Sequence, residues 1–149
     1  MNSNGNRIRK IARDGTISTY AGGGGQSLSD GALATDVSFG MGDDLTLMAD
    51  GSLLLLGEHR ILRIDPTGRI RFFAGTGGGG FSGDGGPAVN AQLNGPSGVA
   101  VARDGSVYIA DATNNRVRKV APDGIITTVV GKGGFCHDNF SEISCFDGQ

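Results

Sequence analysis

Residues 115–124 read Asn-Arg-Val-Arg-Lys-Val-Ala-Pro-Asp-Gly, and closely similar stretches occupy residues 6–15 and 59–68. The glycines that end the three copies, Gly15, Gly68 and Gly124, are 68 − 15 = 53 and 124 − 68 = 56 residues apart. A repeat of this length is typical of folds built from stacked units, because one unit alone cannot bury its apolar face. The repeat therefore predicts the fold more firmly than it predicts the function.

The most complete unit predicts four short strands. They are rich in Val, Ile and Ala and are separated by turn sequences such as Asp104-Gly105. Asp-Gly supplies the positive φ of tight hairpin turns. The expected strands are 98–102, 106–110, 116–120 and 125–130, with counterparts at 44–49, 52–56, 60–64 and 69–74 and, for the last two strands alone, at 7–11 and 16–21. Four antiparallel strands in about 35 residues make one propeller blade.

The composition fits this fold. Glycine provides 28 of the 149 residues, a share far above its average of about 7%, as expected for many short strands joined by turns. Residues 53–56 are apolar without alternation, which is typical of sheets buried on both faces. We therefore predict an all-β partial β-propeller of about two and a half blades. Its expected parts are a half blade at 6–22, blades at 43–75 and 98–131, and the start of another linker at 132–149.

The charge and the hydropathy of the chain exclude some kinds of partner. The net charge is 13 − 15 = −2, which gives no electrostatic reason to expect nucleic acid. The longest apolar run, 53–56, is too short to cross a membrane. The polar first residues do not form a signal peptide. We expect neither a nucleic-acid partner nor a membrane span in this chain.

The linker and strands of the last unit resemble a known repeat. Residues 83–96 read GDGGPAVNAQLNGP, and residues 104–120 read DGSVYIADATNNRVRKV. Together they resemble NHL repeats, a family of six-bladed β-propellers, as found in bacterial surface and Rhs/YD-type proteins and in teneurins. The resemblance extends over residues 6–149. It implies a non-catalytic scaffold in an extracellular or surface protein, with a protein or glycan partner and further blades supplied in cis or by other copies.

The middle unit departs from this pattern. Gly57 stands where the last unit has Asp111, and the loop that follows is two residues shorter and ends in Glu58 and His59. Loops on a rigid scaffold commonly carry recognition, and binding sites usually interrupt a repeat. Gly57, Glu58 and His59 are therefore the predicted binding loop.

Basic residues recur in every copy of the strand motif. We interpret them as structural, paired with Asp111 or with carboxylates of neighbouring blades, because a feature of every blade suits the scaffold. A ligand or RNA surface, as in other NHL domains, is the alternative. The basic residues of the motif are Arg7, Arg9, Lys10, Arg60, Arg63, Arg116, Arg118 and Lys119.

No set of residues predicts catalysis, a metal or a cofactor. His59 and His137 are the only histidines, and they occupy unrelated positions in the repeat. Residues 75–80 spell GxGxxG, but no helix pattern follows to bind a dinucleotide. Asp84 lies in a Gly-rich turn that weakly matches a calcium site. The alternative function is a lyase-like or lactonase-like propeller enzyme, which would need polar ligands in its central channel.

The two cysteines, Cys136 and Cys145, lie near the ends of an insertion in the third linker. Gly131 to Asp147 spans 147 − 131 = 16 residues, whereas Gly75 to Asp84 spans 84 − 75 = 9. Two cysteines that bracket an inserted loop predict a disulfide and therefore an oxidising compartment.

Overall fold

The computed structural model describes residues 6–40, 44–132, 136–139 and 142–145. These residues form two four-stranded and two two-stranded antiparallel sheets. The only helices in this part of the chain are the single 3-10 turns η1 (Ala88–Asn90) and η2 (Ala112–Asn114). The predicted all-β fold of four-stranded propeller blades is confirmed.

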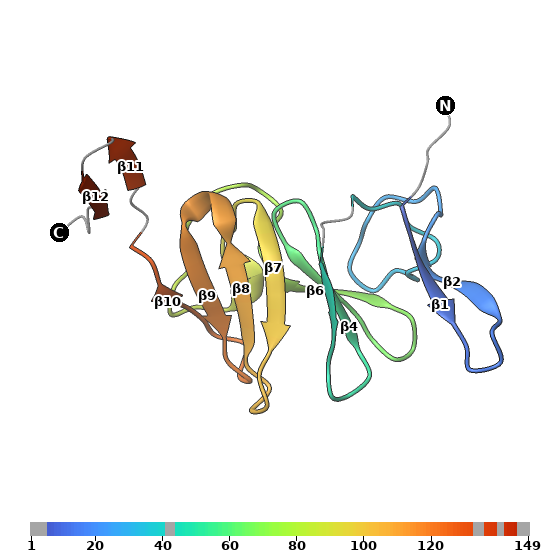
Figure 1. The fold of residues 1–149 in the computed structure, drawn as a ribbon. Helices are drawn as coiled ribbons and strands as arrows, with labels where there is room; N and C mark the ends of the chain where they lie inside the picture. Colours follow the sequence, from blue (N-terminus) through green and yellow to red (C-terminus); the bar gives the residue numbers. More distant parts are fainter. Residues whose placement is uncertain (1–5, 41–43, 133–135, 140–141, 146–149) are drawn as a thin grey trace.

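The sheets follow one another along the chain as the repeat predicts (Figure 1). The half blade consists of β1 (Arg7–Ile11) and β2 (Ile17–Gly22). The middle blade consists of β3 (Leu45–Leu47), β4 (Leu53–Leu56), β5 (Ile61–Ile64) and β6 (Ile70–Ala74). The last blade consists of β7 (Pro96–Val101), β8 (Val107–Asp111), β9 (Arg116–Val120) and β10 (Ile126–Val130). Each strand in a blade pairs with the next one in sequence.

Aspartates close the turns between paired strands. In the β7–β8 turn, Asp104 Oδ1 accepts a hydrogen bond of 2.9 Å from the backbone N–H of Ser106. This bond lowers the pKa of the Asp104 carboxyl, because it favours the charged form. The glycine after each turn aspartate adopts a positive φ, for example 84° at Gly105, which a residue with a side chain adopts only with strain. The Asp-Gly pairs are thereby committed to turn geometry.

The leucines of β4 explain why the strands do not alternate. Leu54 and Leu56 pack in one core cluster with Val107 and other residues of the last blade. Leu53 and Leu55 pack in a second cluster with residues of the half blade, including Ile8. Each face of β4 is therefore covered by a neighbouring blade, and all four of its leucines are buried.

The linker that precedes each whole blade covers the outer edge of that blade. Gly85 donates its N–H to the carbonyl oxygen of Ile126 at 2.8 Å, and Ile126 donates to the carbonyl oxygen of Gly86 at 3.0 Å. The first linker makes the equivalent bonds to Ile70. An unpaired sheet edge can add strands from other chains, so these bonds protect β6 and β10.

Residues 132–149 contain more than the predicted linker. A hairpin of β11 (Cys136–Asn139) and β12 (Glu142–Cys145) forms in this region and pairs Cys136 opposite Cys145. The side chains of both cysteines and of His137 lie outside the described part of the chain, so the disulfide stays a prediction. Within the described residues, no helix is long and apolar enough to cross a membrane.

Candidate functional site

The loop that joins β8 to β9 lies at the end of the last blade opposite the Asp-Gly turns (Figure 1). A buried charged network forms at this loop. Asp111, at the end of β8, is fully buried. Its Oδ1 accepts the N–H of Asn94 at 2.7 Å, and its Oδ2 accepts a hydrogen bond from Asn114 Nδ2 at 2.8 Å. Oδ2 also lies 3.5 Å from Nη1 of Arg118. Three polar partners, one of them a cation, are what this buried carboxylate needs in order to remain charged.

Arg118 is the cation of this network and is also fully buried. Its Nη2 lies 2.7 Å from Asp84 Oδ1 and donates to the carbonyl oxygen of Ser82 at 3.1 Å. Its Nη1 donates to the carbonyl oxygen of Gln92 at 3.3 Å. Burial raises the pKa of Asp84, but interactions with Thr128 and with the Arg118 guanidinium lower it more. Arg118 therefore binds the linker 82–92 to the last blade.

The middle blade lacks this network. Gly57 replaces Asp111, and Leu62 occupies the register position of Arg118, since Leu62 pairs with Leu55 as Arg118 pairs with Ile109. The aspartate and its arginine are thus lost together. Because an apolar residue in place of a buried ion pair leaves no uncompensated charge, the exchange is compatible with stability.

A groove of about 300 Å³ lies where the middle blade lost the network. We call it the His59 groove. Leu28, Phe39 and Leu62 supply its apolar surface, and Ser38, Glu58, His59 and Arg60 supply its polar surface. Leu28 follows Gly22 by 28 − 22 = 6 residues, and Phe81 follows Gly75 by 81 − 75 = 6, so Leu28 also replaces a larger side chain. The predicted binding loop Gly57, Glu58 and His59 lines this groove.

His59 connects the groove to the last blade. Its Nδ1 accepts a hydrogen bond of 3.2 Å from the N–H of Gly95. A side chain at Gly79 would place its Cβ 3.2 Å from the ring atoms Cε1 and Nε2, so glycine allows this close approach. Since Nδ1 accepts, the neutral ring carries its proton on Nε2 and can donate there.

The arginines at the first position of the motif, Arg60 and Arg116, hold backbone rather than carboxylates. Arg116 donates to the carbonyl oxygen of Lys132 at 2.8 Å and lies 3.7 Å from the centre of the Phe81 ring. Arg60 donates to the carbonyl oxygen of Thr76 and lies 4.4 Å from the Phe72 ring centre. These contacts fasten the start of each linker to its blade. Arg7 lies against Gly23 at the equivalent place in the half blade.

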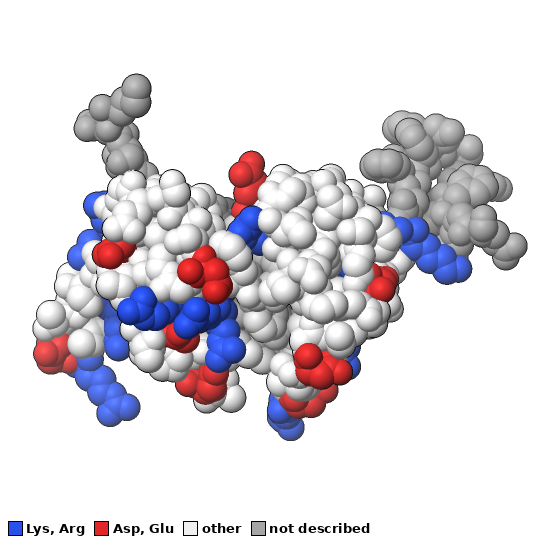
Figure 2. All heavy atoms as spheres, turned by 180° about the vertical axis from the view of Figure 1, so that it is seen from behind, with Lys and Arg blue, Asp and Glu red and all other residues white. Residues whose placement is uncertain are grey.

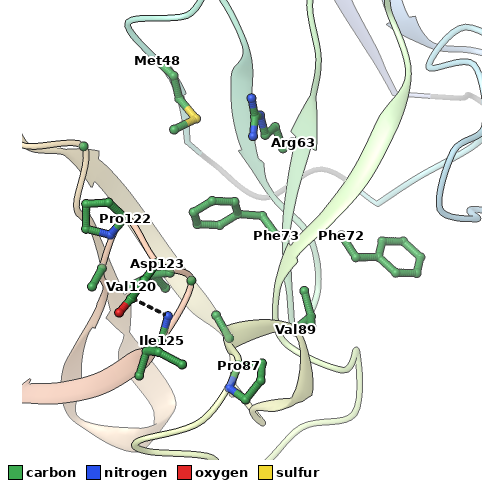
Figure 3. Close-up of a pocket in the computed structure, with 14 residues that line it drawn as sticks. Met48, Arg63, Phe72, Phe73, Pro87, Val89, Val120, Pro122, Asp123 and Ile125 are labelled. Carbon is green, nitrogen blue, oxygen red and sulfur yellow. Dashed lines mark hydrogen bonds between the residues drawn. The ribbon is translucent and has the colours of Figure 1, made fainter.

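A second groove, of about 380 Å³, opens between the middle and last blades nearer the turns. We call it the inter-blade groove. Figure 3 shows Met48 and Phe73 of the middle blade facing Pro122 and Val120 of the last blade across it. Arg63 lines it but is already paired with Asp50. Its surface is mostly apolar.

The surface shows no extended patch of one charge sign on the face in Figure 2, where basic side chains lie beside acidic ones. Arg71, for example, lies 3.5 Å from Asp30 and 3.8 Å from Asp65. The described residues contain no group of three or more His, Cys, Asp or Glu that could hold a metal ion. Asp84 is bonded to Arg118 rather than presented to a cation.

Comparison with known proteins agrees with this architecture. The family model of the teneurin NHL domain matches residues 78–145. Human Teneurin-1 is 41% identical over 67 residues, which cover 45% of this chain and 2% of that protein. Teneurin-m of Drosophila melanogaster is 27% identical over 164 aligned positions, which cover 99% of this chain and 6% of that protein. The chain thus spans only a small part of these relatives.

A solved structure shows the same fold. The virginiamycin B lyase of Staphylococcus aureus superposes with a TM-score of 0.51 and 20% identity, over 83% of this chain and 33% of that chain. At this identity the likeness shows the fold alone. Taken with the repeated four-stranded sheets, this likeness shows that the chain has the fold of a β-propeller. Its residues 78–145 match the family model of the teneurin NHL domain.

Proposed function

We propose that this chain is a non-catalytic recognition scaffold, part of a larger extracellular or surface protein, that binds a protein or glycan partner through the His59 groove. The observation that carries the proposal is the place of the groove, at the blade where the repeat loses Asp111 and Arg118. Scaffold contacts recur from blade to blade, whereas a groove at one departure from the repeat is a property of that blade alone.

The chemistry of the groove suits part of a larger ligand. Its volume of about 300 Å³ lies at the small end of ligand pockets. Apolar Leu28 and Leu62 can cover one side of a sugar ring or a peptide side chain, and Glu58, His59 and Arg60 offer both acceptors and donors at the rim. The similarity to teneurins supports the extracellular placement and the scaffold role.

The second candidate is an enzyme, because the fold is shared with a lyase. Catalysis needs a nucleophile, a base and a stabilising group within mutual reach. In the described part of the His59 groove, His59 is the one imidazole, and its Nδ1 is engaged with Gly95. RNA binding is disfavoured by the net charge of −2.

Binding to panels of glycans and extracellular protein domains tests the proposal, with biolayer interferometry as the readout. Ser38→Trp fills the rim of the groove, and Thr35→Trp places the same side chain on an exposed position of the same linker outside it. We expect a partner whose affinity falls at least tenfold for Ser38→Trp and stays unchanged for Thr35→Trp. Equal affinities for the two variants would refute the site. Turnover of esters or lactones abolished by His59→Ala would favour the enzyme.

A further inference from the structure

Arg60 is the cation of the His59 groove. Its guanidinium donates to the carbonyl oxygen of Thr76 and lies 4.4 Å from the centre of the Phe72 ring, so it is fixed in position. Among the described residues no carboxylate pairs with it. We propose that the groove binds a carboxylated sugar, such as a uronic acid, whose carboxylate pairs with Arg60. This inference rests on the proposed function and specifies the ligand of the same site.

The guanidinium of Arg60 has a donor that its counterpart in the last blade has already used. Arg116 donates from Nη2 to the carbonyl oxygen of Lys132 and from Nη1 to the carbonyl oxygen of Asn114 at 3.1 Å. Asn114 belongs to the 3-10 turn η2, and the loop of the middle blade is two residues shorter. Arg60 makes only the first of these bonds, to Thr76, within the described part of the chain. Its Nη1 is therefore available to a ligand.

The departure from the repeat at Gly57 also opens space beside Arg60. A Cβ at this position would lie 3.1 Å from Cγ of Arg60 and 4.0 Å from Cγ of Leu62. The last blade has the carboxylate of Asp111 at this position in the repeat, whereas the middle blade has no side chain there. The groove thus loses an acid of its own next to a cation that has no acid partner.

The charge balance of the groove suits one carboxylate. Arg60 supplies one positive charge, and the exposed Glu58 supplies one negative charge at the rim. A guanidinium is planar and matches a carboxylate, with which it forms parallel hydrogen bonds. A phosphate with two negative charges would be repelled more strongly by Glu58.

The remaining lining favours a sugar over an acidic peptide side chain. Leu28 and Leu62 give the groove an apolar side for the face of a ring, and Ser38 and His59 offer polar groups for its hydroxyls. The groove of about 300 Å³ is small for a ligand pocket and suits a single ring. An aspartate or glutamate side chain has the carboxylate but no hydroxyls for Ser38 and His59.

Methyl β-glucuronide and methyl β-glucoside are the probes, because the carboxylate of the first replaces the hydroxymethyl group of the second. Chemical-shift titration of the ¹⁵N-labelled chain measures both affinities and locates the site. We expect saturable shifts of the amides of Gly57, His59 and Gly95 with the glucuronide. The glucoside should bind at least tenfold more weakly, as expected for loss of a charge-assisted bond.

Three substitutions test the role of charge. Arg60→Gln should weaken glucuronide binding at least tenfold, whereas Arg103→Gln, at an exposed arginine in the β7–β8 turn, should leave it unchanged. Glu58→Gln keeps Arg60 and its contacts and removes the repelling carboxylate. It should strengthen glucuronide binding about threefold, as expected for an exposed charge pair, and leave glucoside binding unchanged.

Equal affinities for the two sugars, or an unchanged glucuronide affinity in Arg60→Gln, would overturn the inference. Tighter binding of a short aspartate peptide than of the glucuronide would overturn it in favour of a protein ligand. With any of these results, a partner whose affinity Ser38→Trp lowers and Thr35→Trp does not would still support the proposed function. Equal affinities for those two variants would refute the site and this inference together.

Discussion

Replacement of Arg118 by leucine should destabilise the chain far more than the same replacement at an exposed ion pair. Leucine is the residue that the middle blade carries at this position. However, in the last blade it leaves Asp111 fully buried without its cation and removes the hydrogen bonds that Arg118 donates to the carbonyl oxygens of Ser82 and Gln92. The middle blade avoids this defect because it has also lost the aspartate.

The expected cost follows from the burial of both partners. Removal of one member of a buried ion pair typically costs about 3–5 kcal/mol. For a chain of this size each kcal/mol lowers the melting temperature by about 2–4 °C, so Arg118→Leu should lower it by roughly 6–20 °C. Arg63→Leu is the matched control, because the side chains of Arg63 and Asp50 are 34% and 47% exposed. Such a pair contributes about 0–1 kcal/mol.

Thermal and urea unfolding followed by circular dichroism measure the two costs. Asp111→Gly combined with Arg118→Leu copies the middle blade and should cost less than the sum of the two single changes, since neither charge then remains alone. If Arg118→Leu costs no more than Arg63→Leu, the buried network does not hold the linker and the reasoning is refuted.

Three further predictions concern other parts of the chain. Gly24→Ala should lower the free energy of unfolding by about 2 kcal/mol or more, because the added Cβ would lie 2.0 Å from backbone atoms of Asp36. Gly25→Ala is the control, because its Cβ would meet nothing within 4 Å. Hydrogen bonds lower the pKa of turn carboxyls such as Asp104 in the folded state. The stability that these carboxyls contribute is therefore present above their unfolded-state pKa of 3.8, and it is lost as the pH falls through their folded-state pKa. A melting temperature that stays constant below pH 4 would contradict this. Cys136 and Cys145 should form a disulfide, detected as a mass gain of two hydrogens on reduction. Because the two residues face each other on paired strands, their Cα atoms lie about 4.5–5.5 Å apart, which is within disulfide range.

Much of the candidate site could be read from the repeat itself. The place where Gly57 stands for Asp111, followed by a shortened loop, indicated the binding loop, and the His59 groove lies there. The sequence also has Leu62 in the middle unit where the last unit has Arg118, but the sequence does not show what this difference does to the structure. Its significance depends on which arginine points inward, since Arg116 and Arg118 are alike in sequence but differ in partners.

The sequence by itself determined the repeat, the short strands, the Asp-Gly turns and the double-sided burial of the sheets, because these depend on residues close together in the chain or on the spacing of apolar residues. Only the tertiary structure decided which leucine of β4 faces which blade, and which arginine enters the core. It also decided that linker residues 82–94 supply partners for Arg118 and Asp111. Contacts between distant segments depend on how blades stack, and a strand pattern does not specify the partners that another blade or linker brings to it.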